Sequence, residues 1–444
     1  MREKNVNKKM NRRHFLKTVA IAGGAAVTGF PTIVKAAARG KDGAVAPSDR
    51  IVMAGIGFGM MGPGNMSNFL EKNEVQWVAV CDIDKEPLAM ARDMADKRYG
   101  NKSCATYHDF RELFLRKDLD AVSIAVPDHW HAILAISALR AGLDVYGEKP
   151  LTHNLREGRA LCDAVKRYGR IWQTGSWQRS VENFHHAAEL VRNGRLGRIL
   201  RVEVGLPEGH WDFAETFGRE AVTPVPEGLN YDMWLGPAPR FPYREAAVHM
   251  NWRWNMAFGG GQLMDWVGHH VDIAHWGLGF DMTGPVAVEA RGEYAKSGIY
   301  DSPVRYRVEA AYADGTPLVV AGGYPEIWGG TKWIGERGWI WVDRGAFRAE
   351  PASLWDEEIG AGEVRLTKSR DHYRDFLDRV RDRALTIAPC EIAHRSASVG
   401  HLGVAAMTVG RKIHWDPATE TVPGDPEAER SLARSYRAPW QLPA

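Results

Sequence analysis

A glycine-rich turn near the start of the chain limits the folds that this sequence can adopt. The apolar run Ile51–Ile56 predicts a buried strand, and a helical pattern follows at 65–72. Between them, Gly57, Gly59 and Gly62 match G-x-G-x-x-G. Such glycines permit a tight turn and the close approach of a pyrophosphate, which the next helix N-terminus stabilises. The pattern predicts an α/β fold with a doubly wound parallel sheet that binds a dinucleotide.

An acidic residue follows the second predicted strand. Val75–Cys81 reads as that strand, and Asp82 comes twenty residues after Gly62. A carboxylate at this place accepts hydrogen bonds from the ribose and repels a 2′-phosphate, so NAD is favoured over NADP. Asp84 is close enough to be an alternative. We expect Met61, in the glycine turn, to join the cofactor contacts.

The N-terminal segment reads as an export signal. Arg12 and Arg13 precede a weakly apolar run at 18–34, and the small residues of 35–38 follow. This pattern predicts a twin-arginine signal peptide at 1–36, a linker at 37–49, recognition by the twin-arginine export machinery and a periplasmic location. Cleavage is expected after Ala36 or Ala38. An uncleaved anchor is the alternative, but the run is short and glycine-rich for stable insertion in a membrane.

Composition narrows the partners. Without residues 1–36 the chain carries 49 basic and 54 acidic residues, a net charge of −5, so nucleic-acid binding has no support. The four cysteines form no Cys-x-x-Cys pair and no zinc spacing, and we expect free buried thiols at Cys81, Cys104, Cys162 and Cys390.

Two loops are expected at the ligand-binding edge of the parallel sheet. A strand at 120–126 runs into Pro127-Asp128-His129-Trp130-His131, and a strand at 144–147 runs into Glu148-Lys149-Pro150. Ligands of doubly wound sheets gather at the carboxyl ends of strands. A metal bound by His129 and His131, with the pairs 185–186 or 269–270 as further ligands, is a weaker alternative because no pair has a diagnostic zinc spacing. We expect no metal.

A predicted helix beginning at Gly261 carries polar groups along one face. Asp265, His269 and Asp272 stand at i, i+4 and i+7, which places them on one side of a helix. An acid, a near-neutral base and a second acid on an inward face form either a satisfied buried network or a catalytic surface.

These motifs, in this order, resemble those of the Gfo/Idh/MocA oxidoreductases. The resemblance rests on the glycine turn, Pro127-Asp128-His129-Trp130-His131, Glu148-Lys149-Pro150, and the run 259–261 followed by Asp265-x-x-x-His269-x-x-Asp272. It implies a Rossmann domain at 50–172 and a C-terminal α/β domain at 173–412. The second domain would have a large, mostly antiparallel sheet with one open face. Such a face is often used for oligomerisation, so a homodimer or homotetramer is expected.

Elements of the second domain fit this implication. Strand patterns occur at 199–204, 286–290, 304–312, 317–322 and 339–342, and helix patterns at 372–383 and 394–412. The remaining tail, 413–444, is expected to wrap over the surface with Trp440 as an anchor.

The resemblance also implies roles for particular residues. Lys149 would lie near the nicotinamide and the reacting carbinol, and Asp265 and His269 would face the substrate, with His269 as general base. Pro127, His129 and Glu148 would line the cofactor. His270 is an alternative to His269 or a substrate contact, and Asp272 is expected to be structural.

The expected substrate is a carbohydrate. Tryptophan, arginine, asparagine and glutamine lie close together in 175–180 and 251–254, and Arg179 and Trp254 are the predicted pocket residues. We expect oxidation of a carbinol of a sugar, glycoside or polyol by tightly bound NAD, since free cofactor is scarce outside the cytosol. Two alternatives stay open: glycoside cleavage through transient oxidation and elimination, and a non-catalytic NAD-bound sugar-binding protein.

Overall fold

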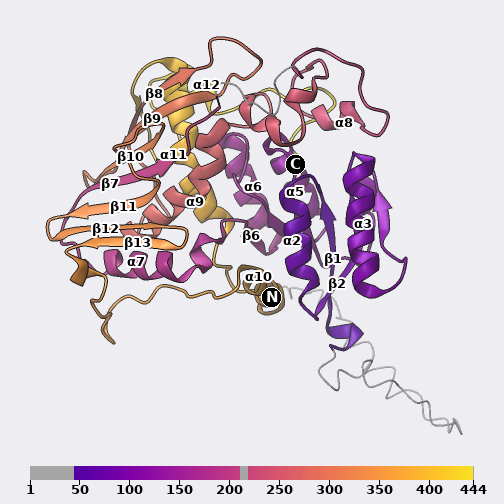
Figure 1. Cartoon of the computed structure of the whole chain (residues 1–444), viewed down its shortest axis with the longest axis horizontal. Helices are drawn as coiled ribbons and strands as arrows, with labels where there is room; N and C mark the ends of the chain where they lie inside the picture. The colour runs from indigo at the N-terminus through magenta and orange to yellow at the C-terminus, as the bar shows by residue number, and fades with distance from the viewer. Residues whose placement is uncertain (1–44, 211–218, 444) are drawn as a thin grey trace, which may run out of the picture. The chain divides into compact units, whose positions relative to one another are not determined.

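A computed structural model describes residues 45–210 and 219–443 (Figure 1). The chain divides into two compact units, Met1–Asp49 and Arg50–Ala444. In the first, the described part holds one short 3-10 helix, Pro47–Asp49. The predicted signal peptide lies outside the described residues.

The second unit contains the predicted parallel sheet. Six parallel strands stand in the order β3-β2-β1-β4-β5-β6, which is the order of a Rossmann fold. They are β1 (Ile51–Ile56), β2 (Val75–Cys81), β3 (Ala105–Tyr107), β4 (Ala121–Ile124), β5 (Asp144–Gly147) and β6 (Trp172–Thr174). All residues of β4 and β5 are buried, as expected for strands covered on both faces by helices.

The helices of this part begin earlier than the sequence pattern predicts. They are α2 (Met61–Leu70), α3 (Lys85–Tyr99), α4 (Phe110–Leu113), α5 (Asp128–Arg140) and α6 (Leu155–Tyr168). The first turn of α2 falls within the glycine motif itself, and α5 starts directly after Pro127. Both helix N-termini therefore follow the carboxyl ends of β1 and β4, where the strand order reverses.

The second sheet is mostly antiparallel, as predicted. Its order is β13-β12-β11-β7-β10-β9-β8-β14, and only β7 and β10 pair in parallel. Its strands are β7 (Ile199–Leu206), β8 (Ala287–Tyr294), β9 (Pro303–Ala311), β10 (Pro317–Gly322), β11 (Gly330–Gly335), β12 (Gly338–Asp343), β13 (Ala346–Glu350) and β14 (Ile413–His414). Three helices pack on this sheet: α7 (Glu182–Arg192), α9 (Gly261–Leu278) and α11 (Cys390–Val409) (Figure 1).

Helix α9 lies in the middle of the largest hydrophobic core. It packs against α7, α11 and β7, and all but three of its eighteen residues are buried. Close packing explains one of its glycines: a Cβ at Gly277 would meet the indole of Trp333 at 3.0 Å. Because so much of α9 is buried, its polar side chains need partners inside the protein.

Two segments from the C-terminal part of the chain pack against the part that contains the first sheet. Helix α10 (His372–Asp382) contributes Phe376 to the core that contains Phe69 and Trp77. In the tail, the ring of Trp440 packs edge-on against Trp130 with centroids 4.7 Å apart, which fits its predicted role as an anchor. The tail also forms α12 (Pro426–Ser431).

The four cysteines are buried and free, as predicted. Those of α6 and α11, Cys162 and Cys390, lie with their sulfur atoms 3.1 Å apart. Among the described helices, none combines the length and the apolarity needed to cross a membrane.

Candidate active site

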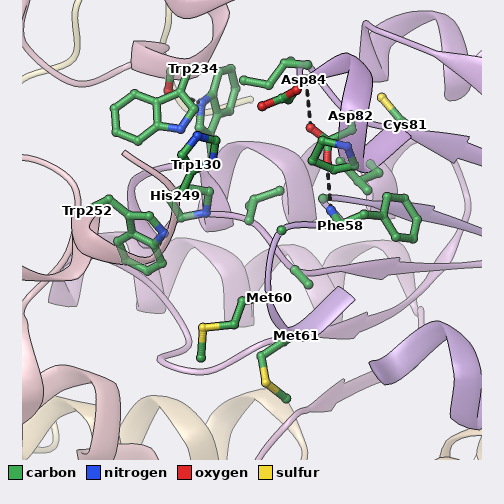
Figure 2. Close-up of a pocket in the computed structure, with 18 of the residues that line it drawn as sticks. Phe58, Met60, Met61, Cys81, Asp82, Asp84, Trp130, Trp234, His249 and Trp252 are labelled. Carbon is green, nitrogen blue, oxygen red and sulfur yellow. Dashed lines mark hydrogen bonds between the residues drawn. The ribbon is translucent and has the colours of Figure 1, made fainter. Parts of the chain in front are cut away.

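A cavity of about 490 Å³ opens at the carboxyl ends of β1, β2 and β4. Its walls come from the glycine turn, from the ends of these strands, and from α8 (Tyr231–Leu235) and the 3-10 helix His249–Trp254 (Figure 2). The predicted cofactor residues at its wall are Gly57, Gly59, Met61, Asp82, Pro127, Glu148 and Lys149. The cavity therefore lies at the switch point of the sheet, where a dinucleotide is expected.

The glycine turn has the shape that a pyrophosphate needs. Gly57 has φ 84°, and a Cβ there would collide with the carbonyl oxygen of Ala125. A Cβ at Gly62 would collide with the carbonyl oxygen of Gly57, so the turn can close only with glycine at both places. A Cβ at Gly59 would meet nothing within 4 Å, which leaves the backbone open to a ligand. The shape of this turn therefore fits the pyrophosphate of NAD.

Asp82 stands beside this turn, at the end of β2. Its carboxylate accepts hydrogen bonds from Phe58 N at 2.8 Å and from Asp84 N at 3.0 Å (Figure 2). Burial raises the pKa of Asp82 to about 6, although these backbone donors lower it in part. Asp84 also borders the cavity, but its carboxylate accepts a hydrogen bond from Glu86 N and caps α3. The geometry favours Asp82 over Asp84 as the ribose acceptor.

The raised pKa of Asp82 predicts a pH-dependent affinity for NAD. A carboxylate can accept from both ribose hydroxyls, whereas the protonated acid has lost part of that capacity. On nucleotide-free protein, calorimetric titration should show NAD affinity rising about tenfold from pH 5 to pH 7 and levelling above that range. Asp82→Asn should remove the dependence, and an equal pH slope in this variant would contradict the assignment.

Lys149, which borders the cavity, pairs with Asp265 of α9. Lys149 Nζ donates to Asp265 Oδ1 at 2.9 Å and to the carbonyl oxygen of Asp265 at 3.0 Å. Arg253 Nε donates to the same Oδ1 at 3.0 Å. Burial raises the pKa of Asp265, but the charges and hydrogen bonds of Lys149 and Arg253 outweigh it and bring the pKa to about 2. One ionised carboxylate thus holds two cations, so these three side chains together carry a net positive charge.

His269 lies one helical turn beyond Asp265. Its side chain is buried, and within the described part of the chain its Nδ1 has no hydrogen-bond partner. Burial, together with the charges of Lys149 and Arg344, lowers its pKa well below the usual range, which keeps the imidazole neutral. The preceding Gly268 lies next to the lysine stem, since a Cβ there would stand 3.6 Å from Lys149 Cβ, at ordinary contact distance. Lys149, Asp265 and His269 therefore form one cluster.

Four other predicted residues lie outside this cluster. His129 faces the core, with ring nitrogens 2.9 Å from the carbonyl oxygen of Trp234 and 3.3 Å from that of Phe258. The ring of Trp254 is buried and packs edge-on against His210. His270 is buried beside Gln178.

The fourth is Arg179, which is 2% exposed and forms a bidentate ion pair with Asp272. It also donates to Asp281 at 2.7 Å. Burial raises the pKa of Asp272, and Arg179 opposes that shift. The geometry gives Arg179 and Asp272 a structural role.

Among the cavity-wall residues that sequence reasoning missed are two charged ones next to the candidate catalytic residues, Arg253 and Asp128. Both lie in motifs whose patterns predicted the neighbouring residues Trp254 and His129 instead. Asp128 opens α5 and is buried, and burial raises its pKa well above the usual range. Its Oδ1 has no hydrogen-bond partner among the described residues. The signal for Asp128 was its place directly after Pro127, at a helix start on the ligand-binding edge.

Over residues 45–210 and 219–443 we find no group of three or more histidine, cysteine, aspartate or glutamate side chains that could hold a metal ion. The two histidines at the start of α5, His129 and His131, direct their ring nitrogens to backbone carbonyl oxygens and not to a shared metal site. Both ring nitrogens of His131 lie within 2.8 Å of backbone carbonyl oxygens, those of Pro150 and Val126.

Comparison with known families agrees with this geometry. Residues 50–176 match the family described as an oxidoreductase family with an NAD-binding Rossmann fold. Residues 181–442 match its C-terminal alpha/beta domain. The chain belongs to the Gfo/Idh/MocA oxidoreductase family. The resemblance drawn from the motifs is thereby confirmed, and with it the NAD-binding Rossmann fold.

Relatives within the Gfo/Idh/MocA family differ in their activities. A glycosyl hydrolase family 109 protein of Shewanella pealeana is 28% identical over 227 residues, covering 47% of this chain and 48% of that protein. D-glucoside 3-dehydrogenase of Escherichia coli is 32% identical over 133 residues, covering 30% of this chain and 36% of that enzyme. The chain thus spans about half, or less, of the curated relatives that it matches.

A solved structure shows the same fold over a longer span. Aldose-aldose oxidoreductase from Caulobacter crescentus, complexed with glycerol, superimposes with a TM-score of 0.60 at 20% identity. The match covers 82% of this chain and 99% of the other.

Proposed function

We propose that this protein oxidises a carbinol of a sugar, glycoside or polyol, with NAD as hydride acceptor. One observation carries the proposal: Lys149 borders the cofactor cavity and at the same time binds Asp265, one turn from the neutral His269. The groups needed to bind and deprotonate a hydroxyl therefore adjoin a lysine that borders the dinucleotide site.

The chemistry divides among these residues. When bound, NAD supplies nicotinamide C4, which accepts a hydride from the carbinol carbon. His269 accepts the hydroxyl proton, because a neutral imidazole has a free acceptor nitrogen. Lys149 has three ammonium donors, of which Asp265 takes two. The third can reach the reacting oxygen and offset the negative charge that develops there. Arg253 keeps Asp265 ionised and in place.

We also propose that the cofactor stays bound between turnovers. The segment at 228–230 is fastened to the end of β2: Lys85 N donates to Gly228 O at 3.1 Å, and Asn230 N donates to Ile83 O at 3.0 Å. Leu229, between these attachments, forms part of the cavity wall. This attachment beside Asp82 supports slow release of NAD. It suits a protein exported to the periplasm through the Arg12-Arg13 signal, as we propose, since free cofactor is scarce there.

Redox-neutral glycoside cleavage is the second candidate. It is favoured by the relatives named as glycosyl hydrolases. Such a reaction would use the same residues for transient oxidation and then return the hydride to the sugar.

One experiment separates the two candidates. Purified mature protein is first denatured to identify the released nucleotide, for which we expect NAD. Intact holoprotein is then mixed with free sugars and aryl glycosides while reduced nicotinamide and free aglycone are both measured. We expect stoichiometric reduction of the bound cofactor. Catalytic release of aglycone without accumulation of reduced cofactor would overturn net oxidation in favour of cleavage, and neither signal with any sugar would overturn both.

A further inference from the structure

An arginine at the tip of a hairpin, Arg344, shares two aromatic neighbours with His269. Arg344 follows Asp343, the last residue of β12, and Gly345 leads into β13. Its guanidinium carbon stands 4.5 Å from the ring centre of Trp177 and 4.7 Å from that of Trp266. Both indoles also contact His269, with ring centroids 6.5 and 5.6 Å away. The arginine and the candidate base therefore share the same two aromatic walls.

The hairpin tip is held firmly in place. Asn183 of α7 donates to the carbonyl oxygens of Asp343 at 2.7 Å and of Ala346 at 3.0 Å, on both sides of the turn. Asp343 accepts the backbone N–H of Arg344 at 2.7 Å. Helix α7 packs on β12 next to this turn. These contacts hold the backbone of the turn, and the two indoles and Gln178 position the Arg344 side chain.

His270 is linked to Arg344 through Gln178. Gln178 accepts a hydrogen bond from Arg344 Nη2 at 3.4 Å, and its amide nitrogen lies 3.3 Å from His270 Nδ1. His270 Nε2 is 3.6 Å from Asp343. Burial and the charge of Arg344 lower the pKa of His270 to about 3, so it is neutral. His270 thus helps to position Gln178, which accepts a hydrogen bond from Arg344.

The guanidinium of Arg344 has aromatic and amide neighbours among the described residues. In the described part of the chain its neighbours are two indole faces and one amide oxygen, and no carboxylate lies within ion-pair distance. The carboxylate of Asp343 is directed to the backbone and to His270 instead. Partial burial lowers the pKa of Arg344, while the charges of Asp343 and Asp265 act on it through space. A guanidinium fixed by aromatic faces keeps its planar fork of donors available for an oxyanion.

We propose that Arg344, clamped between Trp177 and Trp266, binds a carboxylate on the substrate, so that the substrate is an acidic sugar. The proposal rests on the proposed function for the identity of the reacting site. Charge supports it, because Lys149 and Arg253 share one carboxylate and Arg344 adds a further cation. A carboxylate paired with Arg344 would place the sugar ring against the indoles, with its hydroxyls toward His269 and Lys149.

Binding to the reduced holoprotein tests this proposal without turnover, because a chain loaded with NADH cannot accept a hydride. The probes are D-glucuronate, D-galacturonate and D-mannuronate, each compared with its neutral hexose by calorimetry. We expect at least one uronate to bind about tenfold or more tightly than its neutral counterpart, since hydrogen bonds to charged groups are the stronger kind. Added salt should weaken that preference.

Variants locate the effect. Arg344→Gln should abolish the preference, and Arg344→Lys should keep only part of it, because an ammonium lacks the planar fork. Arg348→Gln is the matched control: Arg348 lies on the same hairpin, 5.7 Å above the ring of Trp328, and should leave the preference unchanged. Thermal unfolding checks that all three variants fold.

Three results would overturn the proposal: no uronate binds, every uronate binds no better than its hexose, or the preference survives Arg344→Gln. Failure of the proposed function is seen separately. If no sugar reduces the bound cofactor while the uronate preference still depends on Arg344, the carboxylate site stands and the oxidation does not.

Discussion

Replacing Lys149 with methionine is expected to reduce turnover about 10²- to 10³-fold while the protein stays folded and retains its cofactor. Methionine has a similar length but cannot donate a hydrogen bond or carry charge. Removal of the ammonium leaves the developing oxyanion without its donor. Asp265 keeps Arg253 at 3.0 Å, so no buried carboxylate loses all of its partners. Steady-state kinetics with the best sugar, together with the nucleotide content of the purified variant, measure both effects.

The matched control is Lys117→Met, since Lys117 is an exposed lysine of the same domain that does not border the cavity. It should leave turnover unchanged. A Lys149→Met enzyme that retains turnover within a few-fold of the parent would show that this lysine does not act at the reacting carbon.

Asp272→Ala is expected to destabilise the protein by about 3–5 kcal/mol, the largest stability effect that we predict. The substitution leaves the guanidinium of Arg179, which is 2% exposed, with the more exposed Asp281 as its remaining carboxylate partner. Stacking of Arg179 on Trp276 at 4.9 Å cannot replace the two lost hydrogen bonds. Denaturant unfolding of purified protein measures the change.

A surface pair provides the comparison. Arg198 and Glu336 lie 3.0 Å apart with exposed side chains, and Glu336→Ala should change stability far less than Asp272→Ala, because water screens an exposed ion pair. If Asp272→Ala changed the free energy of unfolding as little as Glu336→Ala does, and sugar binding was lost, Arg179 and Asp272 would belong to the substrate site and not to the core.

Patterns local in sequence predicted much of the fold. The strand before Gly57, the spacing to Asp82, and the periodic runs of the second sheet all describe neighbours along the chain, and the structure contains them. Strands β3 and β6 were not predicted because three residues are too few to show an alternation.

The site was predicted less completely because its contacts join distant segments. Arg253 reaches Asp265 across the glycine loop, and Arg344 reaches Trp266, an aromatic neighbour of His269, from a hairpin tip in the second sheet. In the 3-10 helix His249–Trp254, successive side chains point in different directions, so the choice between Arg253 and Trp254 depends on tertiary packing. Likewise, the start of α5 at Asp128 turns that carboxyl toward the cavity and His129 toward the core.

The central claim, hydride transfer from a sugar carbinol to the bound cofactor, is tested most directly by single-turnover kinetics with deuterated substrate. Holoprotein is mixed with a sugar that carries deuterium at the reacting carbon, and the absorbance of reduced nicotinamide is followed. The account predicts that this signal appears with one equivalent per bound NAD and that deuterium slows it with a primary isotope effect. Consumption of the sugar with no reduced nicotinamide at any time, and at the same rate for both isotopes, would contradict it.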